Sequence, residues 1–196
     1  MPEKVEDLVQ MRWHSRGGQG AKTAADFFTQ VAISEGKYSQ AFPEYGPERS
    51  GAPMRSYTRV SSKPIKLHSA VYNPDAVIIL DPTLIATADV WDGLSEGGTI
   101  IINTHLTPQE ARKEFNIRGY TVFTIDATTI ALDELGRNIP NMPMVGALVK
   151  VSGLVELDHV IEGLRKTFTG KFGKEVVEKN LRAINRAYKE VKGQDA

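Results

Sequence analysis

The residues best suited to chemistry form a glycine cluster near the start of the chain, Arg16-Gly17-Gly18-Gln19-Gly20. Glycines adopt positive φ angles and let a ligand approach the backbone closely. Helical spacing follows, and the free N–H groups at the start of a helix favour a negative charge. The cluster therefore predicts an anion-binding loop. The alternative is a plain strand-to-helix turn whose glycines serve only tight packing.

The cluster departs from both of the phosphate loops that it most resembles. A dinucleotide fingerprint requires glycine or alanine where Thr23 stands, and no clear acidic strand end follows to hold a ribose. A P-loop requires an uninterrupted Gly-Lys-Thr/Ser, but Ala21 separates Gly20 from Lys22. These departures argue against a nicotinamide site and against an NTPase site.

A second candidate region contains no acidic residue. From Arg49 to Pro74 there is no Asp or Glu, whereas Arg49, Arg55, Arg59, Lys63 and Lys66 are basic. In a strand, Arg55 and Arg59 share one face with Tyr57. We expect a local positive patch, about 13 Å between the two arginines, that holds phosphates or an acidic partner. A solvated edge strand protected by its charges is the alternative.

Composition limits the classes of function. The 196 residues suit one α/β domain, residues 1–196, and 24 basic residues balance 24 acidic ones, so neither nucleic acid nor an anionic membrane is an expected partner. The absence of cysteine excludes disulfides, thiolate metal ligands and cysteine-ligated iron–sulfur clusters within the chain. The polar start shows no signal-peptide pattern and apolar runs are short, so we expect a cytoplasmic protein.

Neither metal chemistry nor nucleophilic hydrolysis is indicated. The four histidines are widely scattered without metal-ligand spacing, and no Gly-x-Ser-x-Gly elbow occurs. We therefore predict no catalytic residue and no metal ligand in this chain.

Hydrophobic periodicity predicts the elements that would position these residues. Residues 9–28 predict a strand, a tight loop and a helix, residues 39–53 a shaped loop, and residues 54–60 a strand with an antiparallel return at 65–68. A continuous apolar strand follows at 76–80, another buried strand at 99–103, and a further strand at 120–125. Asp81, Asn103 and Asp126 end these strands, at the edge where open α/β sheets usually bind ligands. A role as helix cap only is favoured for Asp81, before a helix to about Leu94, and for Asp126, and Thr107 opens a capping box.

The C-terminal part is predicted to be helical. Residues 145–151 read as a buried helix, and core-facing stripes follow at 157–168 and 177–191. The pairs Glu175 with Lys179 and Glu178 with Arg182 suit a helix surface. Together, the order of these strands and helices predicts a three-layer, Rossmann-like α/β domain with a mostly parallel, mixed sheet and helices on both faces.

Three stretches resemble the gamma subunit of 2-oxoacid:ferredoxin oxidoreductases, notably pyruvate synthase. They are Arg16–Gly20 with Thr23-Ala24-Ala25, the loop Gln40–Pro53, and Asn138–Met144. The resemblance implies a subunit, inactive alone, of an enzyme that converts pyruvate and coenzyme A to acetyl-CoA and carbon dioxide while reducing ferredoxin.

The resemblance also implies partners and cofactors. Thiamine diphosphate, Mg²⁺ and [4Fe-4S] clusters would belong to the alpha, beta and delta (ferredoxin-like) subunits, ferredoxin would meet the complex, and coenzyme A would bind as substrate at or near this subunit. The expected cofactor-binding residues are Arg16, Gly17, Gly18, Gln19, Gly20, Thr23, Glu48, Arg49, Arg55 and Arg59.

Several alternatives remain open at this point. The complex could act on 2-oxoisovalerate or 2-oxoglutarate instead of pyruvate, or the chain could be a structural scaffold. A free-standing nucleotide-binding enzyme with a degenerate loop is a further reading. The imperfect fingerprint and the missing acidic residue favour a subunit that shapes a coenzyme A channel.

Overall fold

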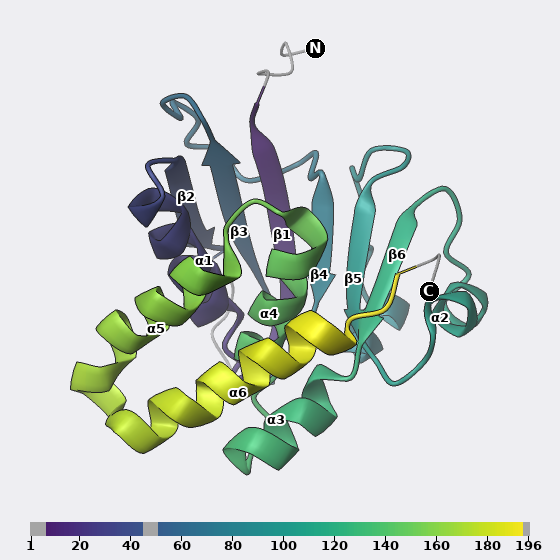
Figure 1. The fold of residues 1–196 in the computed structure, drawn as a ribbon. Helices are drawn as coiled ribbons and strands as arrows, with labels where there is room; N and C mark the ends of the chain where they lie inside the picture. Colours follow the sequence, from purple (N-terminus) through teal and green to yellow (C-terminus); the bar gives the residue numbers. More distant parts are fainter. Residues whose placement is uncertain (1–6, 45–50, 194–196) are drawn as a thin grey trace.

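A computed structural model describes residues 7–44 and 51–193, and these residues form one mixed sheet (Figure 1). Its order is β2-β3-β1-β4-β5-β6. Strands β1, β4, β5 and β6 are parallel, and β3 pairs antiparallel with β1 and β2. The strands are β1 (Val9–Arg16), β2 (Tyr38–Pro43), β3 (Pro53–Ser61), β4 (Ala76–Ile79), β5 (Thr99–Asn103) and β6 (Thr121–Ile125).

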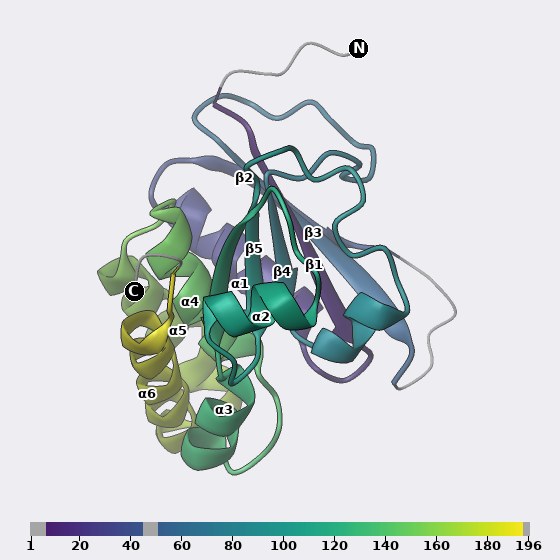
Figure 2. The same cartoon turned by 90° about the vertical axis from the view of Figure 1, so that its right-hand side faces the viewer.

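Helices cover the two faces of the sheet unequally (Figure 2). One face carries α1, α4 and, outside them, α5 and α6, with α3 packed on α6. The opposite face carries α2 and a short 3-10 helix, η1, over β4 to β6. The bounds are α1 (Ala21–Ser34), η1 (Pro82–Ala86), α2 (Pro108–Glu114), α3 (Ala127–Leu135), α4 (Asn141–Ser152), α5 (Leu157–Phe172) and α6 (Lys174–Glu190). The expected three-layer α/β fold is confirmed.

Two hydrophobic clusters explain the apolar runs in the sequence. In β5, Ile101 packs into the cluster beneath α1 and α4, whereas Ile100 and Ile102 pack into the cluster beneath η1 and α2. A strand that is covered on both faces needs apolar residues at every position. The two C-terminal helices turn their stripes inward as predicted, with Leu164 and Ile184 fully buried.

Close packing at Gly146 brings α4 against α6. A Cβ atom placed there would lie 2.4 Å from the carbonyl oxygen of Ile184. Any larger residue would push the two helices apart, which would open the main cluster. Glycine at this position therefore sets the separation of the helix layer.

Two predicted elements were wrong, and two others have different bounds. The expected loop at 39–53 contains β2, an edge strand with polar positions and a proline, which weakened its apolar signal. Residues 65–68 form no strand, because both edges of β3 are already paired, one with β1 and the other with β2.

The helix expected to reach Leu94 ends at Ala86, and turns then carry Val90 and Leu94 into the second cluster. The helix after the 136–144 loop begins earlier than predicted, at Asn141.

Two local predictions on the helices have different outcomes. The ion pair between Glu175 and Lys179 is present, at 2.7 Å. Arg182 instead pairs with Glu134 on α3, because α3 packs directly against that side of α6, and Glu178 pairs with Arg165. Within the described ranges, no helix is long and apolar enough to cross a membrane.

Candidate functional site

The glycine loop joins β1 to α1 and leaves the start of α1 open. Gly18 and Gly20 have φ angles of 98° and 82°, and Gly20 occupies the N-cap position without a side-chain cap. The first turn of α1 contains no acidic residue. Its free N–H groups and its helix dipole therefore favour an anion at this end.

Gly18 and Gly20 have different surroundings. A Cβ atom at Gly18 would meet no atom within 4 Å, so a side chain there would project into open space. A Cβ atom at Gly20 would lie 2.6 Å from Nδ2 of Asn141, whose side chain also approaches the Gly20 carbonyl at 3.4 Å. Gly18 is thus open to a ligand, whereas Gly20 is packed against the start of α4.

Hydrogen bonds join the glycine loop to the segment that leads into β3. The Gly17 amide donates to the Ala52 carbonyl at 2.9 Å, and the Gly51 amide donates to the Gly17 carbonyl at 3.1 Å. Nη1 of Arg16 donates to the Gly51 carbonyl at 3.2 Å. Two stretches that were singled out separately in the sequence therefore form one surface.

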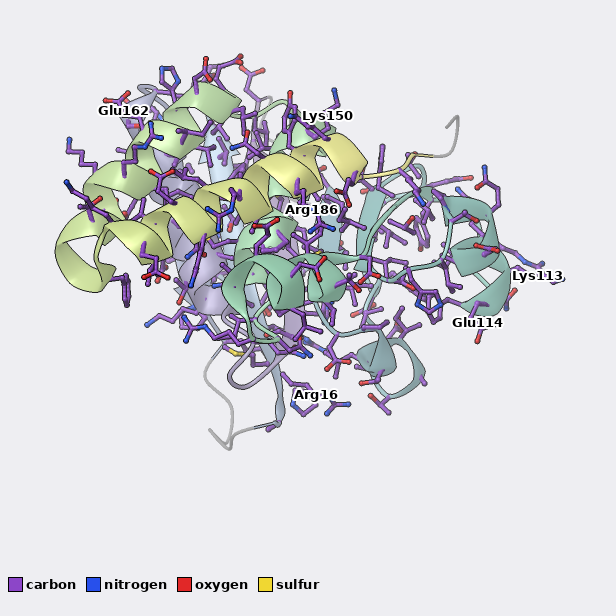
Figure 3. All side chains as sticks on the ribbon, turned by 60° about the horizontal axis from the view of Figure 1, so that its bottom comes forward. Arg16, Lys113, Glu114, Lys150, Glu162 and Arg186 are labelled. Atoms are coloured by element: carbon purple, nitrogen blue, oxygen red, sulfur yellow. The ribbon has the colours of Figure 1, made fainter. Side chains whose placement is uncertain are left out.

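A polar network fixes Arg16 and Gln19 at the carboxyl end of β4. Oε1 of Gln19 accepts from the Arg16 amide at 2.7 Å, and Nε2 of Gln19 donates to Asp81 at 2.9 Å. The Arg16 guanidinium lies 3.3 Å from the same Asp81 oxygen and donates to Oγ1 of Thr83 at 2.9 Å. Figure 3 brings this edge of the sheet forward and shows Arg16 there.

The Asp81 carboxylate is held in its ionised form. Burial opposes its ionisation, but hydrogen bonds from Thr83 and Gln19, together with the Arg16 charge, outweigh burial and lower its pKa. Its other oxygen accepts from the Thr83 amide, so it also caps η1 as predicted. Asp81 therefore does more than the cap-only role expected of it, whereas the Asp126 carboxylate bonds only Thr129 among the described residues.

The face of β3 that carries Arg55 and Arg59 differs from the positive patch that was expected. Arg59 is only 1% exposed, so it cannot contribute to an exposed patch. It donates to Oε1 of Gln10 at 3.0 Å and to the Ser69 carbonyl at 2.7 Å, and its guanidinium lies 5.2 Å from the Phe42 ring. The expectation failed because the segment after β3 folds back over this end of the strand.

Arg55 remains accessible at the other end of the face. Its side chain is 41% exposed and lies 3.7 Å from Glu44, which also accepts a hydrogen bond from the Tyr57 hydroxyl. Arg55 and Glu44 line a pocket of about 230 Å³ together with His14 and Leu84. An anion in this pocket would meet a partly exposed arginine.

Two buried polar side chains of β1 lie behind this pocket. Arg12 donates to the Val90 and Asp92 carbonyls at 3.1 and 2.6 Å and to Nε2 of His14 at 3.0 Å. Because Nε2 accepts, the imidazole proton resides on Nδ1. Burial, followed by the charges of Arg12 and Arg55, lowers the pKa of His14 to about 3, so this histidine is neutral near pH 7.

The remaining expected site residues divide into two groups. Thr23 is exposed in the first turn of α1, beside the open face of the glycine loop. Glu48 and Arg49 lie outside the described residues. Sequence reasoning missed Asp81, Thr83 and Asn141 as partners of the loop. In the sequence, the one feature that could have pointed to Asp81 and Asn141 is that each lies close to the end of a predicted strand or helix.

The fold and the site define an α/β domain that presents a glycine loop, an open helix start and Arg16 at the carboxyl edge of its sheet. Residues 10–190 match the family described as Pyruvate ferredoxin/flavodoxin oxidoreductase. The chain belongs to this family, which confirms the resemblance and its enzyme class, a subunit of a 2-oxoacid:ferredoxin oxidoreductase.

Similar proteins match over nearly the whole chain. Pyruvate synthase subunit PorC of Thermotoga maritima is 48% identical over 188 residues, which are 96% of this chain and 97% of that protein. The pyruvate/ketoisovalerate oxidoreductases common subunit gamma of Thermococcus litoralis is 44% identical and covers 92% and 96% of the two chains. The crystal structure of the Thermotoga maritima PorC subunit superposes with a TM-score of 0.83, at 43% identity, over 96% of this chain and 99% of that one.

Proposed function

We propose that this chain is the gamma subunit of a pyruvate:ferredoxin oxidoreductase, which forms acetyl-CoA and carbon dioxide from pyruvate and coenzyme A and passes electrons to ferredoxin. Similarity to a pyruvate synthase subunit over nearly the full length supports this assignment. The Thermococcus litoralis relative is a gamma subunit common to a pyruvate and a ketoisovalerate oxidoreductase, which bears on substrate choice. A gamma chain common to both reactions leaves the choice of 2-oxoacid to the other subunits.

The proposal places the redox chemistry on partner chains. Alpha, beta and delta subunits would carry thiamine diphosphate, Mg²⁺ and the [4Fe-4S] clusters, and ferredoxin would dock on the assembled complex in the cytoplasm. The cysteine-free sequence supports this division, because it supplies no thiolate for a cluster.

Coenzyme A is the proposed ligand of the surface that joins the glycine loop to β3. The observation that carries this proposal is the pairing of Gly17 with Gly51 and Ala52, which places the open start of α1 beside the segment leading to Arg55. Backbone amides and two accessible arginines, Arg16 and Arg55, suit the phosphates of coenzyme A.

Each expected residue has a place in this proposal. Gly18 and Gly20 would offer backbone amides, Gly18 would also leave open space, and Thr23 would offer a hydroxyl. Gly17, whose amide donates to the Ala52 carbonyl, and Gln19 would hold the loop in shape. Glu48 and Arg49 stay in the proposed set on the strength of the sequence alone. Arg59 supports the fold beneath the surface, since burial keeps it from direct contact.

Steady-state kinetics of the complex, reconstituted from this chain and its partner subunits, test the proposal. Changing Arg16→Gln or Arg55→Gln removes one charge-assisted contact that is partly exposed, so we expect the KM for coenzyme A to rise by about fivefold and the KM for pyruvate to stay unchanged. Lys113→Gln is the matched control, because Lys113 lies on α2, away from Arg16 (Figure 3). Normal coenzyme A kinetics in both arginine variants, with intact assembly, would refute the site.

A further inference from the structure

The carboxyl ends of β4 and β6 each carry an aspartate that caps the following helix, yet the two differ in what else they contact. Asp81 and Asp126 both accept from the amide and hydroxyl of a threonine, Thr83 and Thr129, at 2.6 to 3.0 Å. Only Asp81 also accepts from Gln19 and lies beside Arg16. A cap alone does not require those additional contacts.

From this difference we infer that Asp81 is a positioning residue for the glycine loop, acting on coenzyme A binding through Gln19 and Arg16. This inference rests on the proposed function, because it assumes that the loop binds coenzyme A. Asp81 touches no ligand in this scheme. It holds the side chains of Gln19 and Arg16 in the arrangement that the incoming phosphate meets.

The donors and acceptors leave Gln19 a single orientation. Its Oε1 must accept from the Arg16 amide, which can only donate, and its Nε2 must donate to the Asp81 carboxylate, which can only accept. The Gln19 amide therefore transmits the position of Asp81 directly to the backbone of residue 16. Because the side chain of Asp81 is only 13% exposed, water does not readily replace these bonds.

Asp81→Asn separates this role from the cap. The asparagine oxygen still accepts from the Thr83 amide, but its Nδ2 donors now face Nε2 of Gln19 and the Arg16 guanidinium. If Gln19 turns over to accept from the new amide, it loses its bond to the Arg16 amide instead. Either way one bond in the chain from Asp81 to residue 16 is broken.

The expected kinetic result in the reconstituted complex is a rise of about fivefold to tenfold in the KM for coenzyme A, with kcat nearly unchanged. Asp126→Asn is the matched control, since it makes the same change at a cap with no contact to the loop, and it should leave both constants at their original values. Hydrogen exchange supplies a readout besides activity. The Arg16 amide should exchange faster in Asp81→Asn than in Asp126→Asn.

A double variant tests whether Asp81 acts through Arg16. If it does, Asp81→Asn with Arg16→Gln should raise the KM little beyond Arg16→Gln alone, because residues that act as one unit are not additive. Additive effects, equal behaviour of Asp81→Asn and Asp126→Asn, or a lower KM in Asp81→Asn would overturn the inference. If Arg16→Gln leaves the KM unchanged while Arg55→Gln raises it, the inference fails as well. If neither arginine variant changes the KM in an assembled complex, it is instead the proposed coenzyme A site that fails.

Discussion

Replacing Gly18 or Gly20 of the loop by alanine separates backbone strain from crowding. Gly18 and Gly20 both have left-handed φ angles, 98° and 82°, so an alanine at either position costs about 1 to 2 kcal/mol. Only at Gly20 does the new Cβ atom meet a neighbour, Nδ2 of Asn141 at 2.6 Å, whereas at Gly18 it meets none. Gly20→Ala must therefore displace Asn141 as well.

That displacement sets the expected difference between the two variants. The Asn141 oxygen accepts from the Met142 amide at 2.8 Å, a bond that contributes about 1 kcal/mol when intact. We expect Gly20→Ala to lower the free energy of unfolding by about 1 kcal/mol more than Gly18→Ala. For a chain of this size that difference corresponds to a further loss of about 2 to 4 °C in Tm.

Denaturation of the full chain by urea, followed by circular dichroism, measures both values. The double variant Gly20→Ala with Asn141→Ala should recover about 1 kcal/mol relative to the sum of the single variants, because the crowded atoms are gone. Equal destabilisation by Gly18→Ala and Gly20→Ala, together with additive behaviour of Asn141→Ala, would show that the contact with α4 does not constrain the loop.

Three further changes test other parts of the structure. Arg59→Gln removes a buried guanidinium and its hydrogen bonds to Gln10 and to the Ser69 and Ala70 carbonyls, so it should lower the free energy of unfolding by about 2 to 3 kcal/mol. A complex that still assembles should keep its KM for coenzyme A, in contrast to Arg55→Gln. Burial opposes ionisation of Glu35, but hydrogen bonds from Lys37, the Glu156 amide and His159 lower its pKa below 4.5. The ionised carboxylate therefore stabilises the fold above pH 4.5, and this stabilisation disappears as the pH falls through the lowered pKa. In urea denaturation from pH 7 to 3, the free energy of unfolding should fall less in Glu35→Gln than in the original chain. Arg186→Gln should cost under about 1 kcal/mol, and the loss should vanish in 1 M salt, because the ion pairs of Arg186 with Asp133 and Glu134 on α3 and with Glu190 on α6 are partly exposed.

Sequence patterns predicted the elements whose signals are local. The apolar runs of β4, β5 and β6 were correct because these strands are covered on both faces, and the capping box at Thr107 is present with both of its hydrogen bonds. The edge strand β2 was missed because its half-buried residues alternate weakly and include Pro43. Arg59 was misplaced for a different reason: its burial depends on a segment that returns from residues 69–70.

The two capping aspartates show where such patterns stop being informative. Asp81 and Asp126 each follow an apolar strand and each precede a threonine that they cap, so the sequence gives them the same interpretation. What separates them is strand order: β4 lies beside β1, whereas β5 stands between β4 and β6. The glycine loop leaves the end of β1, so it reaches the aspartate of the neighbouring strand and not the one at the sheet edge. Because strand order is decided by packing of the whole domain, no local pattern could assign Asp81 to the loop.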